Sequence, residues 1–336
     1  MLAWLSSGLF LGWSLGANDA ANVFGTAVTS QMVRFSTAVK LASLFIVLGG
    51  LVNGPAAMET LGSLGQIKTF SDAFSVSLAA AIAIAVMTRL GLPVSTSQAV
   101  VGALIGFLLF EENGINDLSW QSLRFILLTW VASPILAAAT AFSIYKLLMR
   151  MFLCLPMPLL AMDRWVRFSH ILVGCYGAWA LGGNNMANVV GVFFHLSVFD
   201  PVQIGPWTIS QSRSLALLGG LAISLGAVTY SYRVMEMVGR NLVRLDSVSA
   251  LIAVLSEAIV VDFFAHHWNL GAFILPAIPV STSQALVGGV LGVGIARGIQ
   301  TIKMRVLLYI ALGWIVTPLL AGAAAWVILP FLNGIT

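Results

Sequence analysis

Charged side chains are scarce in this chain: Asp, Glu, Lys and Arg together make up 8% of its 336 residues. Soluble domains carry roughly 25% charged residues, so the composition excludes a soluble globular protein. No polar stretch is long enough to fold as a separate domain. The apolar runs are continuous and lack the ~10-residue alternation that is typical of a membrane β-barrel. The composition therefore predicts an integral membrane protein whose spanning elements are α-helices.

Cysteine is nearly absent, and the two that occur, Cys154 and Cys175, fall in a predicted loop and in an apolar segment. That placement is typical of free thiols and not of a disulfide or a metal site. The chain also lacks the His-Glu-X-X-His motif, so an intramembrane enzyme is only a remote alternative. The basic residues behind the net charge of +4 fall in loops, which does not indicate a nucleic-acid partner.

Ten apolar segments can be drawn along the chain, five in each half. In the first half they cover residues 2–30, 36–57, 73–89, 93–110 and 121–149. In the second half they cover residues 168–196, 212–232, 247–265, 279–296 and 304–333. A membrane-spanning helix needs about 20 residues, and several segments are shorter or are interrupted by Gly, Asn or Pro. The pattern therefore predicts broken helices or re-entrant hairpins besides plain spans.

The distribution of basic residues predicts the orientation in the membrane. Thirteen of the 16 Lys and Arg residues fall in the loops that follow the first, third, fifth, seventh and ninth segments. Such residues concentrate on the cytoplasmic side, so we expect both termini on the non-cytoplasmic side of the cell membrane. Residues 150–167 are then a cytoplasmic linker between a first repeat, 1–149, and a second repeat, 168–336.

Polar residues gather in two copies of one motif inside apolar segments. Residues 16–25 read GANDAANVFG, and residues 182–191 read GGNNMANVVG. Polar groups inside a membrane are costly, so their default interpretation is functional. The single charged position is not kept, since Asp19 is matched by Asn185.

Two further matches occur in the same order. Residues 93–99 read PVSTSQA and recur as residues 279–285, while Ser133-Pro134 is matched by Thr317-Pro318. Together the matches predict that the halves are structural repeats. Because each half has an odd number of segments, the second would enter the membrane in the opposite sense, as in secondary transporters with a site near the midplane. The second half also carries extra residues, and residues 265–276 are a candidate insertion.

The PVSTSQ stretches are typical of helix starts, since Pro suits the first turn and Ser and Thr cap free N–H groups. One interpretation is an ordinary capped helix, and the other, which the two identical copies favour, is an oxyanion site. A helix N-terminus supplies N–H donors and a partial positive charge, and no intramembrane Lys or Arg pair is available for the task. The candidate anion-binding residues are Ser95, Thr96, Ser97, Gln98, Ser281, Thr282, Ser283 and Gln284.

The Asn and Asp residues suit a hard cation such as Na⁺, which prefers oxygen ligands. The motif glycines would allow helix breaks that expose carbonyls, or else close helix packing. The alternative is that the amides only hydrogen-bond neighbouring helices, a role that explains Asp19 less well. The candidate cation-binding residues are Asn18, Asp19, Asn22, Asn184, Asn185 and Asn188, with Na⁺ expected at Asp19, Asn18 and Asn185. Glu257 is a further candidate, the alternative being a buried carboxyl with satisfied hydrogen bonds.

At these residues the chain resembles the PiT family of inorganic phosphate transporters. The family's Gly-Ala-Asn-Asp-X-Ala-Asn motif is matched fully by residues 16–22 and in part by residues 182–188. Its Pro-(Val/Ile)-Ser-Thr-Thr-His motif is matched by residues 93–98 and 279–284. The resemblance covers essentially the whole chain. It implies phosphate uptake coupled to Na⁺ or H⁺, inverted repeats with re-entrant elements, and a homodimer.

Several positions depart from the family pattern. The family's His is replaced by Gln98 and Gln284, which do not titrate near neutral pH, and the acidic residue that many members carry in the second helix aligns with Ile46. Members with a Ser-Thr-Ser motif resemble sulfate permeases. Phosphate near pH 7 keeps a proton that it can donate to a carboxylate, whereas sulfate does not. We expect a phosphate importer coupled to Na⁺, with H⁺ coupling and sulfate as the alternatives.

Overall fold

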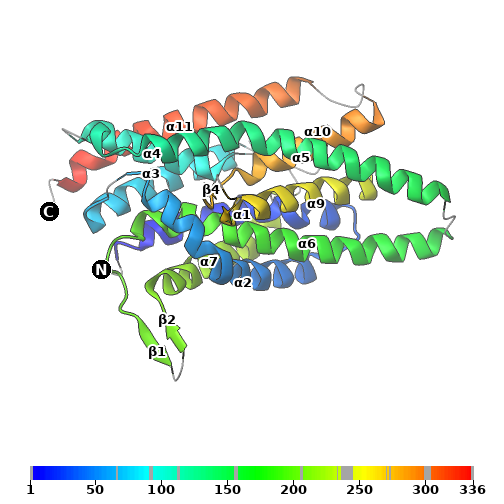
Figure 1. Cartoon of the computed structure of the whole chain (residues 1–336), viewed down its shortest axis with the longest axis horizontal. Coiled ribbons are helices and arrows are strands. Elements are labelled where there is room, and N and C mark those ends of the chain that lie inside the picture. Colours follow the sequence, from blue (N-terminus) through cyan, green and yellow to red (C-terminus); the bar gives the residue numbers. More distant parts are fainter. Residues whose placement is uncertain are drawn as a thin grey trace.

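Figure 1 shows the computed structural model, which describes residues 3–65, 67–90, 94–111, 114–154, 158–204, 207–232, 234–235, 245–269, 271, 274–298 and 304–333. The helices of the first half are α1 (Ser6–Thr29), α2 (Phe35–Gly62), α3 (Phe70–Arg89), α4 (Thr96–Phe110) and α5 (Trp120–Cys154). Those of the second half are α6 (Leu159–Val190), α7 (Gln211–Thr229), α9 (Ser247–Phe264), α10 (Thr282–Arg297) and α11 (Met304–Asn333). Pro93 and the loop residues Arg233, Arg240, Arg244 and Lys303 lie outside the described residues.

Each of the ten predicted apolar segments overlaps one of these helices over most of its length, so the all-α interpretation is confirmed. Six described helices are long and apolar enough to cross a membrane, namely α2, α3, α5, α7, α9 and α11. The sixth segment starts earlier than predicted, because α6 begins at Leu159 rather than near residue 168. Pro158 precedes its first turn, and the following Leu, Ala, Met and Arg residues favour helix.

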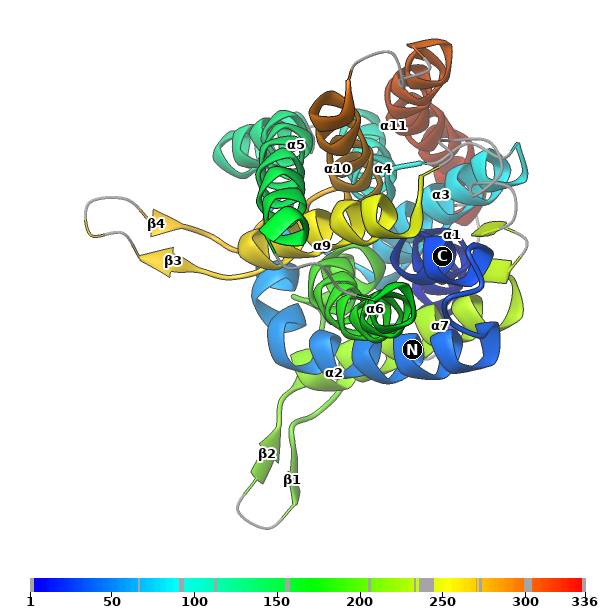
Figure 2. The same ribbon diagram turned by 90° about the vertical axis from the view of Figure 1, so that its right-hand side faces the viewer.

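Two short hairpins interrupt the helices of the second half. Strands β1 (Val202–Ile204) and β2 (Trp207–Ile209) pair antiparallel between α6 and α7. Strands β3 (Trp268–Asn269) and β4 (Ile274–Leu275) pair antiparallel between α9 and α10, so the predicted insertion folds as a hairpin. Both hairpins project from the helical body in Figure 2.

The helices form two groups, and α1 and α6 both belong to the first group. Figure 2 shows α2, α6, α7 and α1 on one side, and α5, α10, α4 and α11 on the other. Both termini lie at one end of the molecule, and the last turn of α5 and the first turn of α6 lie at the other end (Figure 1). The predicted orientation requires this arrangement, and the sidedness itself stays a prediction.

Glycines of the two Asn-rich motifs permit close contact between helices. A Cβ atom at Gly16 would collide with the backbone carbonyl of Ile223 on α7, and one at Gly182 would collide with that of Ile46 on α2. Helix α1 runs unbroken through its motif, and α6 continues to Val190, so that only Gly191, the last residue of the second motif, lies beyond the helix. Of the two roles considered for these glycines, the structure therefore shows close packing and no helix break.

The short helices that carry the second motif pack in a matching way. A Cβ atom at Gly102 on α4 would collide with Pro318 of α11, and one at Gly288 on α10 would collide with Pro134 of α5. Both prolines belong to the third sequence match between the halves. Residues that correspond in the sequence thus make corresponding contacts in the structure.

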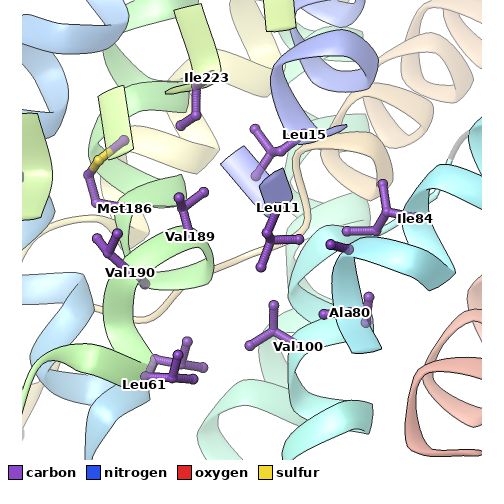
Figure 3. Close-up of a cluster of buried hydrophobic side chains, with 14 of the residues drawn as sticks. Leu11, Leu15, Leu61, Ala80, Ile84, Val100, Met186, Val189, Val190 and Ile223 are labelled. Carbon is purple, nitrogen blue, oxygen red and sulfur yellow. The ribbon is translucent and has the colours of Figure 1, made fainter. Parts of the chain in front are cut away.

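An apolar cluster lies beside the motifs, toward the end of the molecule that holds the termini (Figure 3). Leu11 and Leu15 precede the motif on α1, while Val189 and Val190 follow Asn188 on α6, which runs in the opposite direction. The cluster continues through α2, α3 and α4. On this side, buried hydrocarbon side chains therefore pack between the motif helices and their neighbours.

At the opposite end, an aspartate joins α9 to α10. The Asp246 carboxylate accepts hydrogen bonds from the backbone N–H and the hydroxyl of Ser249, each at 2.9 Å, and so caps α9. Arg297, in the last turn of α10, pairs with the same carboxylate. Burial would raise the pKa of Asp246, but the Ser249 hydrogen bonds and the Arg297 charge hold that pKa below its ordinary value.

Replacing Gly16 by Ala should destabilise the protein, because the new methyl group would meet the Ile223 carbonyl. Overpacking of this kind costs about 1–3 kcal/mol. The matched control is Gly25→Ala in the same helix, where a Cβ atom would come no closer than 3.4 Å to Met235. Thermal unfolding of the purified protein in detergent measures both variants. Equal melting temperatures for the two would contradict the packing argument.

Replacing Asp246 by Asn keeps an oxygen that can cap α9 but removes the ion pair with Arg297, so stability near neutral pH should fall by up to about 1 kcal/mol. Since the folded-state pKa of Asp246 lies below its unfolded value, its contribution is present above about pH 4 and is lost as the pH falls through the folded pKa. The difference in melting temperature between wild type and variant should therefore shrink in acid. A difference that stays constant from pH 7 to acid would show that the charge contributes nothing.

Candidate functional site

Both Ser/Thr-rich stretches are helix starts, as predicted. Ser95 caps α4 by accepting a hydrogen bond from the backbone N–H of Gln98 at 3.3 Å. Ser281 caps α10 in the same way, accepting from the N–H of Gln284 at 3.2 Å. The remaining N–H groups of a first helical turn have no partner within the helix. Two helix N-termini with buried hydroxyls therefore enter the middle of the protein.

The segments that lead into these two helices cross each other. The Ser97 hydroxyl donates to the backbone carbonyl of Val280 at 3.1 Å, and the Ser283 hydroxyl donates to that of Val94 at 2.7 Å. The two bonds are equivalent under the sequence match, and each is buried. The predicted anion-binding stretches of the two halves are thus brought into direct contact.

The second-half asparagines hold this crossing against α6. The Asn184 side chain accepts from the N–H of Val280 at 2.8 Å and donates to its carbonyl at 2.9 Å. Asn188 donates to the hydroxyl of Ser97 at 3.1 Å and to Oδ1 of Asn185 at 2.9 Å. Asn184 therefore does what the alternative interpretation of the motif amides expected, which is to hydrogen-bond a neighbouring segment.

The first-half motif makes fewer contacts. Asn18 donates to the Thr88 hydroxyl of α3 at 2.9 Å, and the Thr282 hydroxyl of α10 donates to Oδ2 of Asp19 at 3.0 Å. Asp19 is 1% exposed, and its Oδ1 atom has no hydrogen-bond partner among the described residues. The carboxylate therefore reaches the start of α10 with one oxygen and leaves the other free.

Glu257 of α9 lies close enough to Asp19 for their charges to interact, and it is 3% exposed. Neither carboxylate forms an ion pair with a Lys or Arg among the described residues. Burying a charge without a partner is costly. This pair of carboxylates therefore requires a cation or a proton beside it.

Several buried polar atoms of the predicted site residues lack a hydrogen-bond partner. Buried groups in proteins are normally hydrogen-bonded, so an exception calls for an explanation such as a ligand. Within the described part of the chain, seven buried side-chain atoms without a partner come from the predicted site residues. They are Asp19 Oδ1, Asn22 Nδ2, Thr96 Oγ1, Gln98 Oε1, Asn188 Oδ1, Glu257 Oε2 and Gln284 Oε1. Carboxylate and amide oxygens are suitable ligands for Na⁺.

Four polar residues near the site were not among the predicted site residues. Thr88 contacts Asn18, as described above. Asp262 of α9 accepts from the Tyr176 hydroxyl at 3.1 Å and from the Asn53 amide at 3.5 Å. Each is a polar residue within an apolar helix, and that signal was available in the sequence. None of them belongs to a motif that recurs in both halves, which was the criterion for most of the predicted site residues.

Comparison with known proteins identifies a family. The profile described as "Phosphate transporter family" matches residues 15–325. Two relatives, from Pyrococcus horikoshii and Methanocaldococcus jannaschii, are each named "putative phosphate permease". The first is 28% identical, and the alignment covers 97% of each chain. The second is 29% identical and covers 95% of this chain and 93% of its own.

A solved structure described as "The sodium-dependent phosphate transporter" is also similar. It has a TM-score of 0.83 and 25% sequence identity, and the match covers 100% of this chain and 99% of that one. The family consists of transporters and not of enzymes, and the apolar helices make this chain a multi-pass membrane protein. The chain belongs to the phosphate transporter family.

Proposed function

We propose that this protein imports inorganic phosphate together with Na⁺ by alternating access. The observation that carries the proposal is the buried pair Asp19 and Glu257, which has no basic partner and lies beside two hydroxyl-rich helix starts. Such a site attracts a cation through the carboxylates and an anion through the helix N-termini. The name of the similar solved structure, a sodium-dependent phosphate transporter, supports the same function.

Phosphate is placed at the starts of α4 and α10. Thr96 and Thr282 supply hydroxyls there, and the first-turn N–H groups supply donors. Most of the unpartnered site atoms are acceptors, which include the free oxygens of Asp19 and Glu257. Acceptors suit a cation and a protonated anion, and phosphate carries a proton near neutral pH. Sulfate, the second candidate substrate, has no proton to donate to these carboxylates.

Na⁺ is placed at Asp19. Asn18 and Asn185 were the other predicted ligands. Their amide nitrogens donate to Thr88 and Leu181, and Oδ1 of Asn185 also accepts from Asn188. The free oxygen of Glu257 is available, so we assign Glu257 to the cation as well. Because a bound cation offsets the charge of the anion in a medium of low dielectric, the two should be carried together.

Alternating access is proposed to move the two helix groups against each other. One group is α1, α2, α6 and α7, and the other contains the helix pairs α3–α4 and α9–α10 with α11 and α5. The site lies where the groups meet, with Asp19 on one side and Thr282 on the other. Matching contacts in the two halves support the predicted inverted repeats. The homodimer remains a prediction from the family resemblance.

Purified protein in liposomes should accumulate labelled phosphate only when a Na⁺ gradient is directed inward, because the carboxylate pair needs a cation to accompany the anion. Replacing Na⁺ by K⁺ should abolish accumulation, and an inward pH gradient should not restore it. An excess of sulfate should leave the uptake unchanged. Uptake driven by the pH gradient alone would contradict Na⁺ coupling, and full inhibition by sulfate would identify the alternative substrate.

Replacing Asp19 by Asn should reduce Na⁺-driven phosphate uptake by at least about tenfold. A charge-assisted contact is worth about 1.5–3 kcal/mol, and each 1.4 kcal/mol is tenfold. Asn keeps an oxygen that can accept from Thr282, so the fold should be preserved. The matched control is Asp117→Asn, a partly exposed carboxylate paired with Lys68, which should transport normally. Wild-type uptake in the Asp19 variant would remove this residue from the mechanism.

A further inference from the structure

The two connections that lead into the site are built differently. Only six residues separate the end of α3 from the start of α4, whereas the β3–β4 hairpin lies between α9 and α10. In Figure 2 this hairpin projects away from α9. The chain then returns through residues 276–280, called here the lead-in segment, to Ser281 at the start of α10. Among the described residues of the first half, this hairpin has no counterpart.

Every backbone N–H group of the lead-in segment is accounted for. Pro276 and Pro279 have none. Val280 donates to Asn184 at 2.8 Å, and Ile278 donates to the backbone carbonyl of Phe264 at 2.8 Å. The remaining donor is Ala277, whose N–H points to Nδ1 of His267 at 3.2 Å. One of the three restraints therefore comes from a side chain at the base of the hairpin.

These restraints lie in a buried place. Ala277, Ile278 and Val280 are each at most 1% exposed. A buried N–H without a partner costs free energy comparable to a lost hydrogen bond, and water has little access to replace it. If His267 were removed, the lead-in segment would shift or the amide of Ala277 would stay unpaired.

The two adjacent histidines have opposite roles. Nδ1 of His266 lies 2.7 Å from the backbone carbonyl of Asp262, which can only accept, so His266 donates. Nδ1 of His267 faces an N–H group, so it must accept and carries no proton. His267 therefore acts as a neutral acceptor, and His266 closes the last turn of α9.

The position of the lead-in segment determines where the start of α10 lies in the site. Both backbone groups of Val280 are bound, by Asn184 and by the Ser97 hydroxyl, and Ser281 is the cap of α10. The next residue, Thr282, donates to Asp19. A displacement that begins at Ala277 would therefore move the Thr282 hydroxyl and the N-terminus of α10 relative to Asp19.

We propose that His267 is a positioning residue of the anion site. Its Nδ1 atom accepts from the N–H of Ala277 and so holds the lead-in segment in place. The lead-in segment in turn positions the second Ser/Thr stretch relative to α6. The chemical group that the site needs here is an uncharged hydrogen-bond acceptor at the δ position of the side chain. The proposal rests on the proposed function for its transport readout, but not for its structural readout.

The test compares His267→Leu, which removes the acceptor, with His267→Asn, whose Oδ1 atom can occupy the place of Nδ1 and cannot titrate. His266→Leu is the matched control for loss of a neighbouring imidazole. In Na⁺-driven uptake, His267→Leu should raise the KM for phosphate by about tenfold with a much smaller change in maximal rate. His267→Asn should restore the wild-type KM, and His266→Leu should leave it unchanged.

Hydrogen exchange gives a second readout that needs no phosphate. In Na⁺ alone, the amides of Ala277 and Thr282 should exchange faster in His267→Leu than in wild type or His267→Asn. Unchanged exchange or an unchanged KM in His267→Leu overturns the proposal, as does a failure of Asn to rescue. If the wild-type protein takes up no phosphate, the proposed function fails, and faster exchange at both amides still supports the positioning role.

Discussion

A carboxylate in a medium of low dielectric stays charged only while something positive lies beside it. Asp19 and Glu257 have no basic side chain beside them among the described residues, so a cation or a proton must meet this condition. The N-terminal ends of α4 and α10 place a partial positive charge close to these carboxylates. The helices must approach closely to achieve this, which explains why glycines stand at their contacts.

The broad architecture could be predicted from the sequence because apolar runs and repeated motifs report it directly. The ten segments and the capped starts of α4 and α10 follow from local composition, and the insertion before α10 follows from the wider spacing of the motifs in the second half. The beginning of α6 was misplaced by about nine residues, because Arg164 and Arg167 made a helical stretch resemble a loop. Charge reports the exposure of a segment and not its secondary structure.

The partners of the motif residues could not be predicted. The bonds from Asn184 to Val280 and from Ser97 to the same residue join positions that lie far apart in the chain, and only the packed helices bring them together. The sequence predicted one shared role for the motif amides, yet the side chain of Asn184 binds both backbone groups of Val280. Glu257 was the least certain candidate, because nothing in the sequence shows that α9 carries it to Asp19.

The apolar cluster of Leu11, Leu15, Val189 and Val190 has a consequence for energy conversion. If ions could pass straight through a protein that binds them inside a membrane, the voltage across that membrane would be lost. Moving a bare Na⁺ ion past these hydrocarbon side chains would require it to give up oxygen ligands that nothing there replaces. In the proposed transport cycle, the cluster would act as electrical insulation on the terminal side of the site, so that the cell keeps its ion gradient.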